Sequence, residues 1–440
     1  MSGLSQRPIG WRLGSVVATL ATLALALVAP PATARTLAIV GGTVHPVSGP
    51  SYVGTVVVRD GLIEAAGTDV AAPSDAEIID AAGLHVYPGL FNAFTSVGLS
   101  EIGSISATQD TTELGDTPHL KAIEAIHPAS EIIPVTRANG ITHVVSAPSG
   151  GPWAGQASAV LLDGWTVEEM AIEASVGLVL EWPSLETREF DFSTFSVREK
   201  KFSEAKKEYD RTVEELADWI EAARQYDHAR SAAGSGAAVE RNHALEAVAA
   251  VNRGEAPLIV VADRALAIRD AVGFAEEHGL RLVLASGRDA AKEAELLAEK
   301  GVAVILGAVQ ALPVQEDDAY DAPFTSPAEL QRAGVAIAFG TFDSSSARVL
   351  PYEAATAVAF GLDPEAALRS LTLGAAEILG LDDRLGSIDA GKWANLIVTD
   401  GDPLEVRTAV RRVIVRGREV DLSNRHSRSY ELYGGRPAPP

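Results

Sequence analysis

Few side chains of this sequence stand where they could do chemistry. The chain has 440 residues and no cysteine, which excludes disulfides, thiolate metal sites and cysteine nucleophiles. A glycine-rich segment at residues 149–156 follows an apolar run and could bind a ligand, or it could be only a tight turn. Within it, Gly155 and Gln156 are candidate substrate-binding residues. Glu181, which ends another apolar run, is a third.

A second group of polar residues lies in the long segment 98–130. Its carboxylates could bind a hard cation through oxygen, although simple exposure in an acidic protein explains them more economically. Two histidines in the same segment, His119 and His127, could reach a site from this loop. The carboxylates are Glu101, Asp110, Glu113 and Asp116.

The elements that must position these residues are apolar, strand-length runs alternating with helical stretches. Such runs indicate a parallel sheet buried on both faces. Eight of them predict a (β/α)8 TIM-like barrel, an α/β fold. A doubly wound open sheet is the alternative, but no G-x-G-x-x-G loop follows the first run. The runs are 84–94, 143–147, 157–162, 177–180, 258–262, 281–285, 302–307 and 335–340.

The two ends of the chain are richer in strands than the middle. Asp60-Gly61 lies between two alternating runs and predicts a hairpin, and a matching strand pair occurs near residues 395–416. We therefore expect a small composite β-sandwich built from residues 35–87 and 385–421. The barrel would span residues 88–384. The polar, glycine- and proline-rich tail, 422–440, is expected to be disordered.

The first 34 residues resemble a secretory signal peptide. Arg7 and Arg12 precede the uncharged apolar run 16–28, and Ala32-Thr33-Ala34 offers a cleavage site. The run is short for a membrane span, so a retained anchor is the less favoured alternative. Cleavage would leave no membrane span and an exported protein, periplasmic or secreted. The formal net charge of −23 argues against nucleic acid as a partner.

Several motifs then resemble one family. The chain carries Gly41-Gly42-Thr43 and, further on, Pro88-Gly89-Leu90. Near the other end it has Ile378-Leu379-Gly380-Leu381 and Asp400-Gly401-Asp402-Pro403. In this order they resemble the amidohydrolase superfamily, in its imidazolonepropionase-like branch. The resemblance implies the barrel and sandwich expected above. It also implies one or two metal ions, usually zinc, held by histidines at the barrel mouth, where a metal-bound water attacks the substrate.

The ligands of that metal are missing from this sequence. The family's first-strand His-x-His corresponds to Phe94 and Ser96, the fifth-strand histidine to Val261, and the sixth-strand end to Ser286. No histidine of the chain lies at the carboxyl end of a predicted barrel strand. Asp343 resembles the family's eighth-strand aspartate displaced by one residue, so it is either the surviving catalytic carboxylate or a loop residue.

Three functions remain open. By family the chain would hydrolyse non-peptide C–N bonds in cyclic amides or similar small molecules, with metal-dependent catalysis lost or weakened. Alternatively, it is a non-catalytic ligand-binding or structural subunit that partners an active paralogue. A third possibility is an enzyme independent of the ancestral metal. We expect a small-molecule ligand and no cofactor, with zinc or another divalent metal only at a non-standard site. Assembly as a homo-oligomer or with a paralogue would fit either of the first two functions.

Overall fold

The computed structural model describes residues 36–111, 116–185, 187–191, 196–233, 239–313, 315 and 318–436. The expected signal peptide and Glu113 lie outside these residues. Within the described part of the chain, no helix is both long enough and apolar enough to cross a membrane.

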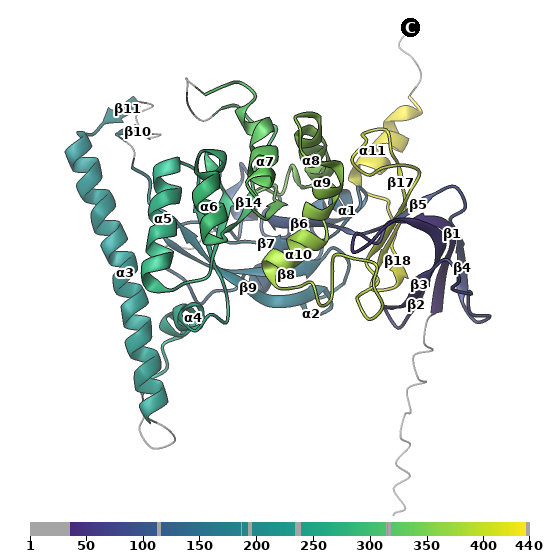
Figure 1. Ribbon diagram of the computed structural model, residues 1–440, viewed down its shortest axis with the longest axis horizontal. Coiled ribbons are helices and arrows are strands. Elements are labelled where there is room, and N and C mark those ends of the chain that lie inside the picture. Colours follow the sequence, from purple (N-terminus) through teal and green to yellow (C-terminus); the bar gives the residue numbers. More distant parts are fainter. Residues whose placement is uncertain are drawn as a thin grey trace, which may run out of the picture. The chain divides into compact units, whose positions relative to one another are not determined.

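A nearly closed barrel sheet forms the centre of the described chain and confirms the TIM-like prediction (Figure 1). Its first and last strands meet where the Phe342 N–H donates to the Phe94 carbonyl at 2.9 Å. The strands are apolar along nearly their whole length, because their inward side chains fill the barrel interior and helices or loops cover the outer face. In spatial order they are β6 (Leu90–Thr95), β7 (Ile141–Ser146), β8 (Trp153–Leu161), β9 (Ala171–Glu181), β12 (Leu258–Ala262), β13 (Leu282–Ser286), β14 (Ala303–Leu306) and β15 (Ile337–Phe339).

One strand departs from the parallel sheet that the sequence predicts. β8 runs antiparallel to both β7 and β9. The connections at 147–152 and 162–170 hold only the short helix α2 (Val167–Met170), and a parallel crossover needs a dozen or more residues. The reversal brings the start of β8 and the end of β9 to the same end of the barrel. Both ends therefore lie at the mouth.

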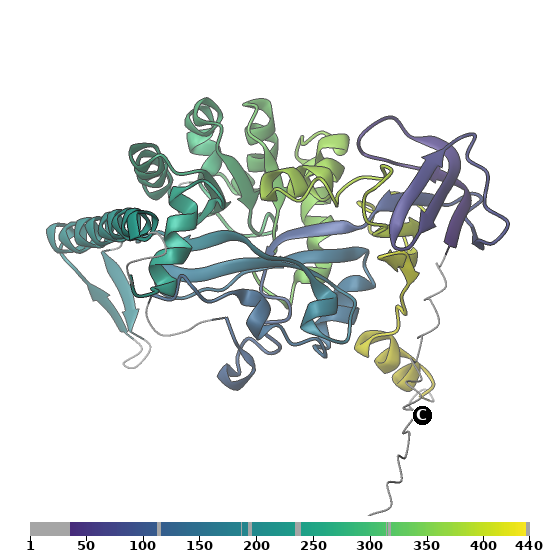
Figure 2. The same ribbon diagram turned by 90° about the horizontal axis from the view of Figure 1, so that it is seen from below.

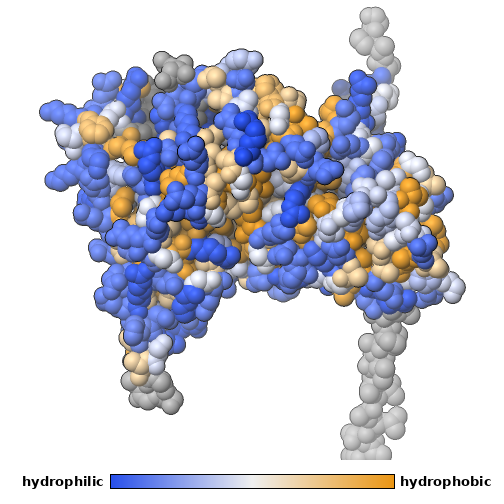
Figure 3. All heavy atoms as spheres, viewed as in Figure 1, coloured by the Kyte–Doolittle hydropathy of each residue, from blue (hydrophilic) through white to orange (hydrophobic). Residues whose placement is uncertain are grey.

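Helices cover the second half of the barrel. α5, α6, α7 and α8 stand side by side along β12 to β15 (Figure 1). The long helix α3 packs one apolar face on the core through the buried Leu216 and Ile220, whereas Phe202 at its start is exposed. The outer side of α3 is hydrophilic (Figure 3). The helices are α1 (Ile132–Arg137), α3 (Phe202–Ala233), α4 (His243–Asn252), α5 (Ala265–His278), α6 (Ala294–Lys300), α7 (Ala322–Arg332), α8 (Leu350–Ala359), α9 (Pro364–Ser370) and α10 (Leu373–Leu379).

Strands from both chain ends build the smaller β-sandwich domain (Figure 2). The link is β5, which pairs with the N-terminal β1 on one side and the C-terminal β16 on the other. The interior of the sandwich domain is a separate apolar cluster that includes Val56, Val86 and Leu396. The strands are β1 (Thr36–Val44), β2 (Tyr52–Arg59), β3 (Leu62–Gly67), β4 (Glu77–Asp80), β5 (His85–Pro88), β16 (Leu396–Thr399), β17 (Val410–Val415) and β18 (Arg418–Glu419).

The tail corrects one prediction. Residues 422–440 were expected to be disordered, but Arg425–Gly434 form the helix α11. Asn424 and Ser427 begin it with a capping box, in which each side chain bonds the other residue's backbone N–H. This local signal outweighs the polar composition on which the expectation rested.

Candidate functional site

The carboxyl ends of the barrel strands place a set of side chains around one mouth. Glu181 on β9 is directly opposite Val261 on β12, which is opposite Ala285 on β13. Residues directly opposite in a sheet face the same side. Glu181 therefore stands beside the position where the family resemblance places a histidine, and that position carries an apolar side chain.

Two aromatic rings fill the part of the mouth next to the barrel seam. Phe94, at the end of β6, stacks on Phe342 with ring centroids 4.5 Å apart and planes at 24°. Phe342 adopts a positive φ of 59°, unusual for a bulky residue. Gly340 allows the close packing, because a Cβ there would lie 2.8 Å from the Phe94 carbonyl oxygen. The first ligand position of the family thus holds a packed apolar ring.

A buried network of neutral polar groups next to the rings joins β6 to the segment that follows β15. The Asn92 amide donates to the Thr341 hydroxyl at 2.8 Å and accepts from the Thr341 N–H at 3.1 Å. The Thr95 hydroxyl donates to the Asp343 carbonyl at 2.7 Å. All three side chains are at most 6% exposed. In a site of low dielectric such mutually satisfied groups fix one arrangement of the seam.

A serine and a carboxylate meet at a neighbouring part of the mouth. The Ser286 hydroxyl, at the end of β13, donates to the Asp263 carboxylate at 2.6 Å. Ser286 has φ of +70°, and its hydroxyl lies 3.3 Å from the place a Cβ on Gly307 would take. Asp263 was missed in the sequence. Only its position in the sequence could have identified it, because it comes directly after the buried strand β12, two residues beyond Val261.

These residues do not fit a histidine-held metal ion. Phe94 and Val261 offer no ligand atom, and the Ser286 hydroxyl is already bonded to a carboxylate. Among the described residues there is no group of three or more histidines and carboxylates that could hold a metal. The loop carboxylates serve the chain itself: Glu101 accepts from Ser130 and Asp116 from the Trp153 N–H.

The three predicted substrate-binding residues lie at the mouth end of β8 and β9. The Glu181 carboxylate accepts from the Gly150 N–H at 2.9 Å and so holds the glycine-rich loop. The Gln156 side chain donates to the Pro118 carbonyl at 3.1 Å. The backbone around Leu120 comes so close to Gly155 that only glycine fits there, because a Cβ would lie 2.9 Å from the Leu120 carbonyl oxygen. All three residues contact the loops that surround the mouth.

Asp343 lies just outside the barrel seam. Its side chain is exposed, and its carboxylate accepts from the Ser345 hydroxyl at 2.9 Å and from the Ser346 N–H at 2.7 Å. It thereby caps the turn that leads into η4 (Ala347–Val349) and α8. Only its carbonyl oxygen faces the network of Thr95 and Thr341.

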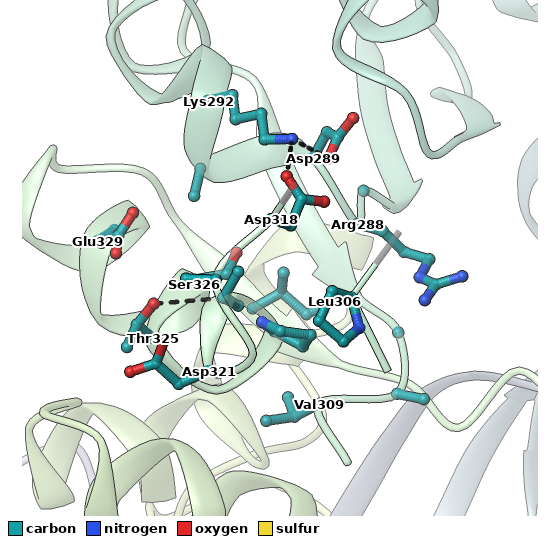
Figure 4. Close-up of a pocket in the computed structure, with 18 of the residues that line it drawn as sticks. Arg288, Asp289, Lys292, Leu306, Val309, Asp318, Asp321, Thr325, Ser326 and Glu329 are labelled. Atoms are coloured by element: carbon teal, nitrogen blue, oxygen red, sulfur yellow. Dashed lines mark hydrogen bonds and ion pairs between the residues drawn. The ribbon is translucent and has the colours of Figure 1, made fainter. Parts of the chain in front are cut away.

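A cavity of about 370 Å³ opens between the ends of β13 and β14 and the helix α7 (Figure 4). Ser286 and Gly307 line it, so it adjoins the mouth. Its wall near β13 carries Lys292, whose ammonium bonds Asp318 at 2.7 Å and Asp289 at 2.9 Å. The opposite wall is apolar, formed by Leu306 and Val309 among others. This mixture suits a small organic molecule.

A buried carboxylate that the sequence did not reveal holds the segment that follows β14. Glu353 on α8 is 7% exposed and accepts from the Gln310 N–H at 2.8 Å. Burial raises the pKa of Glu353, and the backbone N–H groups of Gln310 and Val309 oppose this rise by stabilising the carboxylate. The sequence could have indicated Glu353 in one way, because it is a lone carboxylate on an otherwise apolar helix face.

Comparisons of sequence and of structure with known proteins both find amidohydrolases. The sequence model of the amidohydrolase family matches residues 170–420. Amidohydrolase tasK of Hapsidospora irregularis is 25% identical over 418 residues, which cover 86% of this chain and 41% of that protein. The chain thus spans well under half the length of this curated relative.

The solved structures show the same fold. An amidohydrolase from Thermotoga maritima MSB8 superposes with a TM-score of 0.77 at 28% identity, covering 88% of this chain and 99% of that one. A prolidase complexed with n-methylphosphonate-l-proline gives a TM-score of 0.54 at 18% identity, covering 88% and 99%. A molinate hydrolase gives 0.53 at 18%, covering 88% and 95%. The last two likenesses show the fold alone.

Proposed function

Because this chain belongs to the amidohydrolase family, we propose that it binds a small molecule with a non-peptide C–N bond at the barrel mouth, and that metal-dependent hydrolysis there is lost or weakened. The observation that carries the proposal is the Phe94–Phe342 stack at the family's first ligand position. Binding needs only the fold and a cavity, both of which the chain retains. Metal-assisted hydrolysis needs ligand atoms at this position.

The side chains around the mouth suit a small polar molecule that carries amide groups. The cavity beside Ser286 offers apolar walls from Leu306 and Val309 with polar groups along one side. Glu181 and Asp263 supply carboxylates on the neighbouring strand ends. Amide N–H groups would donate to such oxygens, which suits cyclic amides or capped dipeptides.

The test combines metal analysis with ligand binding on the purified full chain. Cyclic amides and capped dipeptides are screened by thermal shift, and each compound that binds is assayed for hydrolysis with EDTA or with added zinc. We expect a compound to raise Tm equally with and without EDTA, and no hydrolysis that EDTA abolishes. A stoichiometric metal removed by EDTA together with turnover would refute the proposal.

A matched pair of variants locates the binding site. Gly307→Leu fills the space beside Ser286 and Phe342, because a Cβ at this position already comes within 3.4 Å of both side chains. Gly273→Leu changes an exposed glycine of α5 that has an ordinary φ and nothing within 4 Å. Binding lost in the first variant and kept in the second supports the mouth as the site. Binding kept in a folded Gly307→Leu protein counts against it.

A further inference from the structure

A chain of three polar side chains lies in the sandwich domain, outside the barrel mouth. The Ser51 hydroxyl is 2.8 Å from Nδ1 of His45, and Nε2 of His45 is 2.9 Å from Nδ1 of His85. His45 and Ser51 belong to the loop between β1 and β2, whereas His85 opens β5. A hydroxyl beside an imidazole that is oriented by a third group is the arrangement of an activated nucleophile.

The surroundings hold the central imidazole in place. The His45 ring stacks on the buried Tyr87 with centroids 4.1 Å apart and planes at 8°. Val47, between His45 and Ser51, has φ of +66°, a strained value for a β-branched residue. Strain of this kind persists where the surroundings fix it, and it recurs at functional sites.

The hydrogen-bonded side chains of Ser51 and His45 border a cavity that could hold a substrate. His45, Ser51 and Tyr87 line a cavity of about 660 Å³ whose far wall is Pro364 and Leu368 of α9. Ser51 is exposed to it. Asp402 and Glu365 also line this cavity, so its charge disfavours anionic molecules.

We propose that Ser51 is the nucleophile of a second site, which cleaves small neutral or cationic esters with His45 as general base and His85 as its positioning residue. This site is separate from the barrel mouth and does not depend on the function proposed there.

The protonation states suit the role. Burial lowers the pKa of His45, and the neighbouring His85 lowers it further, while Asp402 acts in the opposite direction. At neutral pH His45 is therefore mainly uncharged. With its proton on Nε2, it donates to Nδ1 of His85 and accepts from the Ser51 hydroxyl at Nδ1. That tautomer is the one a general base requires.

The reaction balances without any further reagent. Ser51 Oγ forms a bond to the ester carbonyl carbon, its proton passes to Nδ1 of His45, and the carbonyl π electrons move to oxygen. When the tetrahedral intermediate collapses, the C–O bond to the alcohol breaks and the alcohol takes that proton. Water then attacks the acyl-serine, giving its proton to His45, and Ser51 leaves with it. The sum is ester plus water giving acid plus alcohol.

Labelling of the full chain with a fluorophosphonate tests the proposal directly. We expect one covalent adduct per chain on the peptide that contains Ser51, and hydrolysis of p-nitrophenyl acetate that EDTA leaves unchanged. Ser51→Ala removes both, and His45→Gln slows labelling at least tenfold. EDTA insensitivity separates this activity from any metal-dependent hydrolysis at the mouth.

Ser48→Ala is the matched control. Ser48 lies in the same loop and lines the same cavity, but its hydroxyl donates to Asp389 at 2.8 Å instead of to a histidine. Its loss should leave labelling unchanged. Because Ser51 is exposed, Ser51→Ala should unfold at the wild-type temperature. An unlabelled wild-type chain, or labelling that persists in Ser51→Ala, would overturn the proposal.

Discussion

The ring of Phe94 on β6 stacks on the ring of Phe342 after β15, with centroids 4.5 Å apart. The contact joins the first and last strands of the barrel, next to the backbone bond from Phe342 N–H to the Phe94 carbonyl. The position that a metal ligand holds in the family therefore contributes here to closing the barrel. Stability, in addition to binding, should depend on it.

Phe94→Ala should lower the free energy of unfolding by about 3 kcal/mol, the usual cost of deleting a buried aromatic side chain. Phe94 is 7% exposed and packs on both Phe342 and Gly340. Urea denaturation followed by circular dichroism measures the loss. Phe202→Ala, at a 63% exposed phenylalanine of α3, is the control and should change stability by less than about 0.5 kcal/mol. Equal effects in the two variants would contradict this role of Phe94.

The hydrogen bonds between Asn92 and Thr341 lead to a second prediction. Thr341→Val keeps the shape of the side chain but leaves the Asn92 amide, buried and 2.8 Å away, without its acceptor. An unsatisfied buried donor costs about 1–3 kcal/mol. Thr68→Val, at an exposed threonine, provides the control. Unfolding curves that coincide for Thr341→Val and the wild type would show that the network adds nothing.

The barrel strands could be predicted from sequence because a strand buried on both faces must be apolar along its length. The predicted run 258–262 coincides with β12, and 281–285 differs from β13 by one residue at each end. The direction of β8 was not predicted, since composition is the same for either direction. The short connection 147–152 was the available signal, because it cannot hold a parallel crossover.

The candidate site was predictable only where a motif fixes the position of a residue. Phe94 and Val261 were identified because the amidohydrolase motif places a ligand there. The partners Asp263 and Glu353 were not, since their roles depend on Ser286 and Gln310, which lie 23 and 43 residues away in the sequence. Ser51 and His45 are six residues apart, but the third member, His85, reaches them only through the pairing of β5 with β1.

Asp343 was the candidate catalytic residue, and its geometry predicts a structural role. Its carboxylate accepts from the Ser346 N–H and caps the turn before α8. Asp343→Ala should cost about 1 kcal/mol of stability, as loss of a cap does. Asp343→Asn keeps an acceptor oxygen and should cost less.

Ligand binding and any turnover at the mouth should be unchanged in Asp343→Asn. Thermal unfolding and the assays described for the mouth provide the measurements. A folded Asp343→Asn protein that had lost its turnover would restore Asp343 as a proton-transfer residue.

His143 on β7 predicts how stability depends on pH. Its side chain is fully buried, its Nδ1 bonds the Thr142 hydroxyl at 2.7 Å, and Nε2 has no partner. Burial lowers the pKa of His143 from 6.5 to about 3. Between these values the unfolded chain binds a proton that the folded chain does not. The free energy of unfolding should therefore decrease as the pH falls from about 6.5 toward 3, by at most about 1.4 kcal/mol per pH unit from this residue.

His143→Asn tests the assignment, because an asparagine amide can still meet Thr142 but does not titrate. The variant will be less stable at pH 7, where the imidazole fills its site, yet its stability should fall less steeply between pH 6.5 and 4. Urea denaturation at several pH values gives both slopes. His119→Asn, at an exposed histidine, should retain the wild-type slope. If His143→Asn also retained it, the acid sensitivity would have to come from other groups, and the buried neutral state of His143 would not govern it.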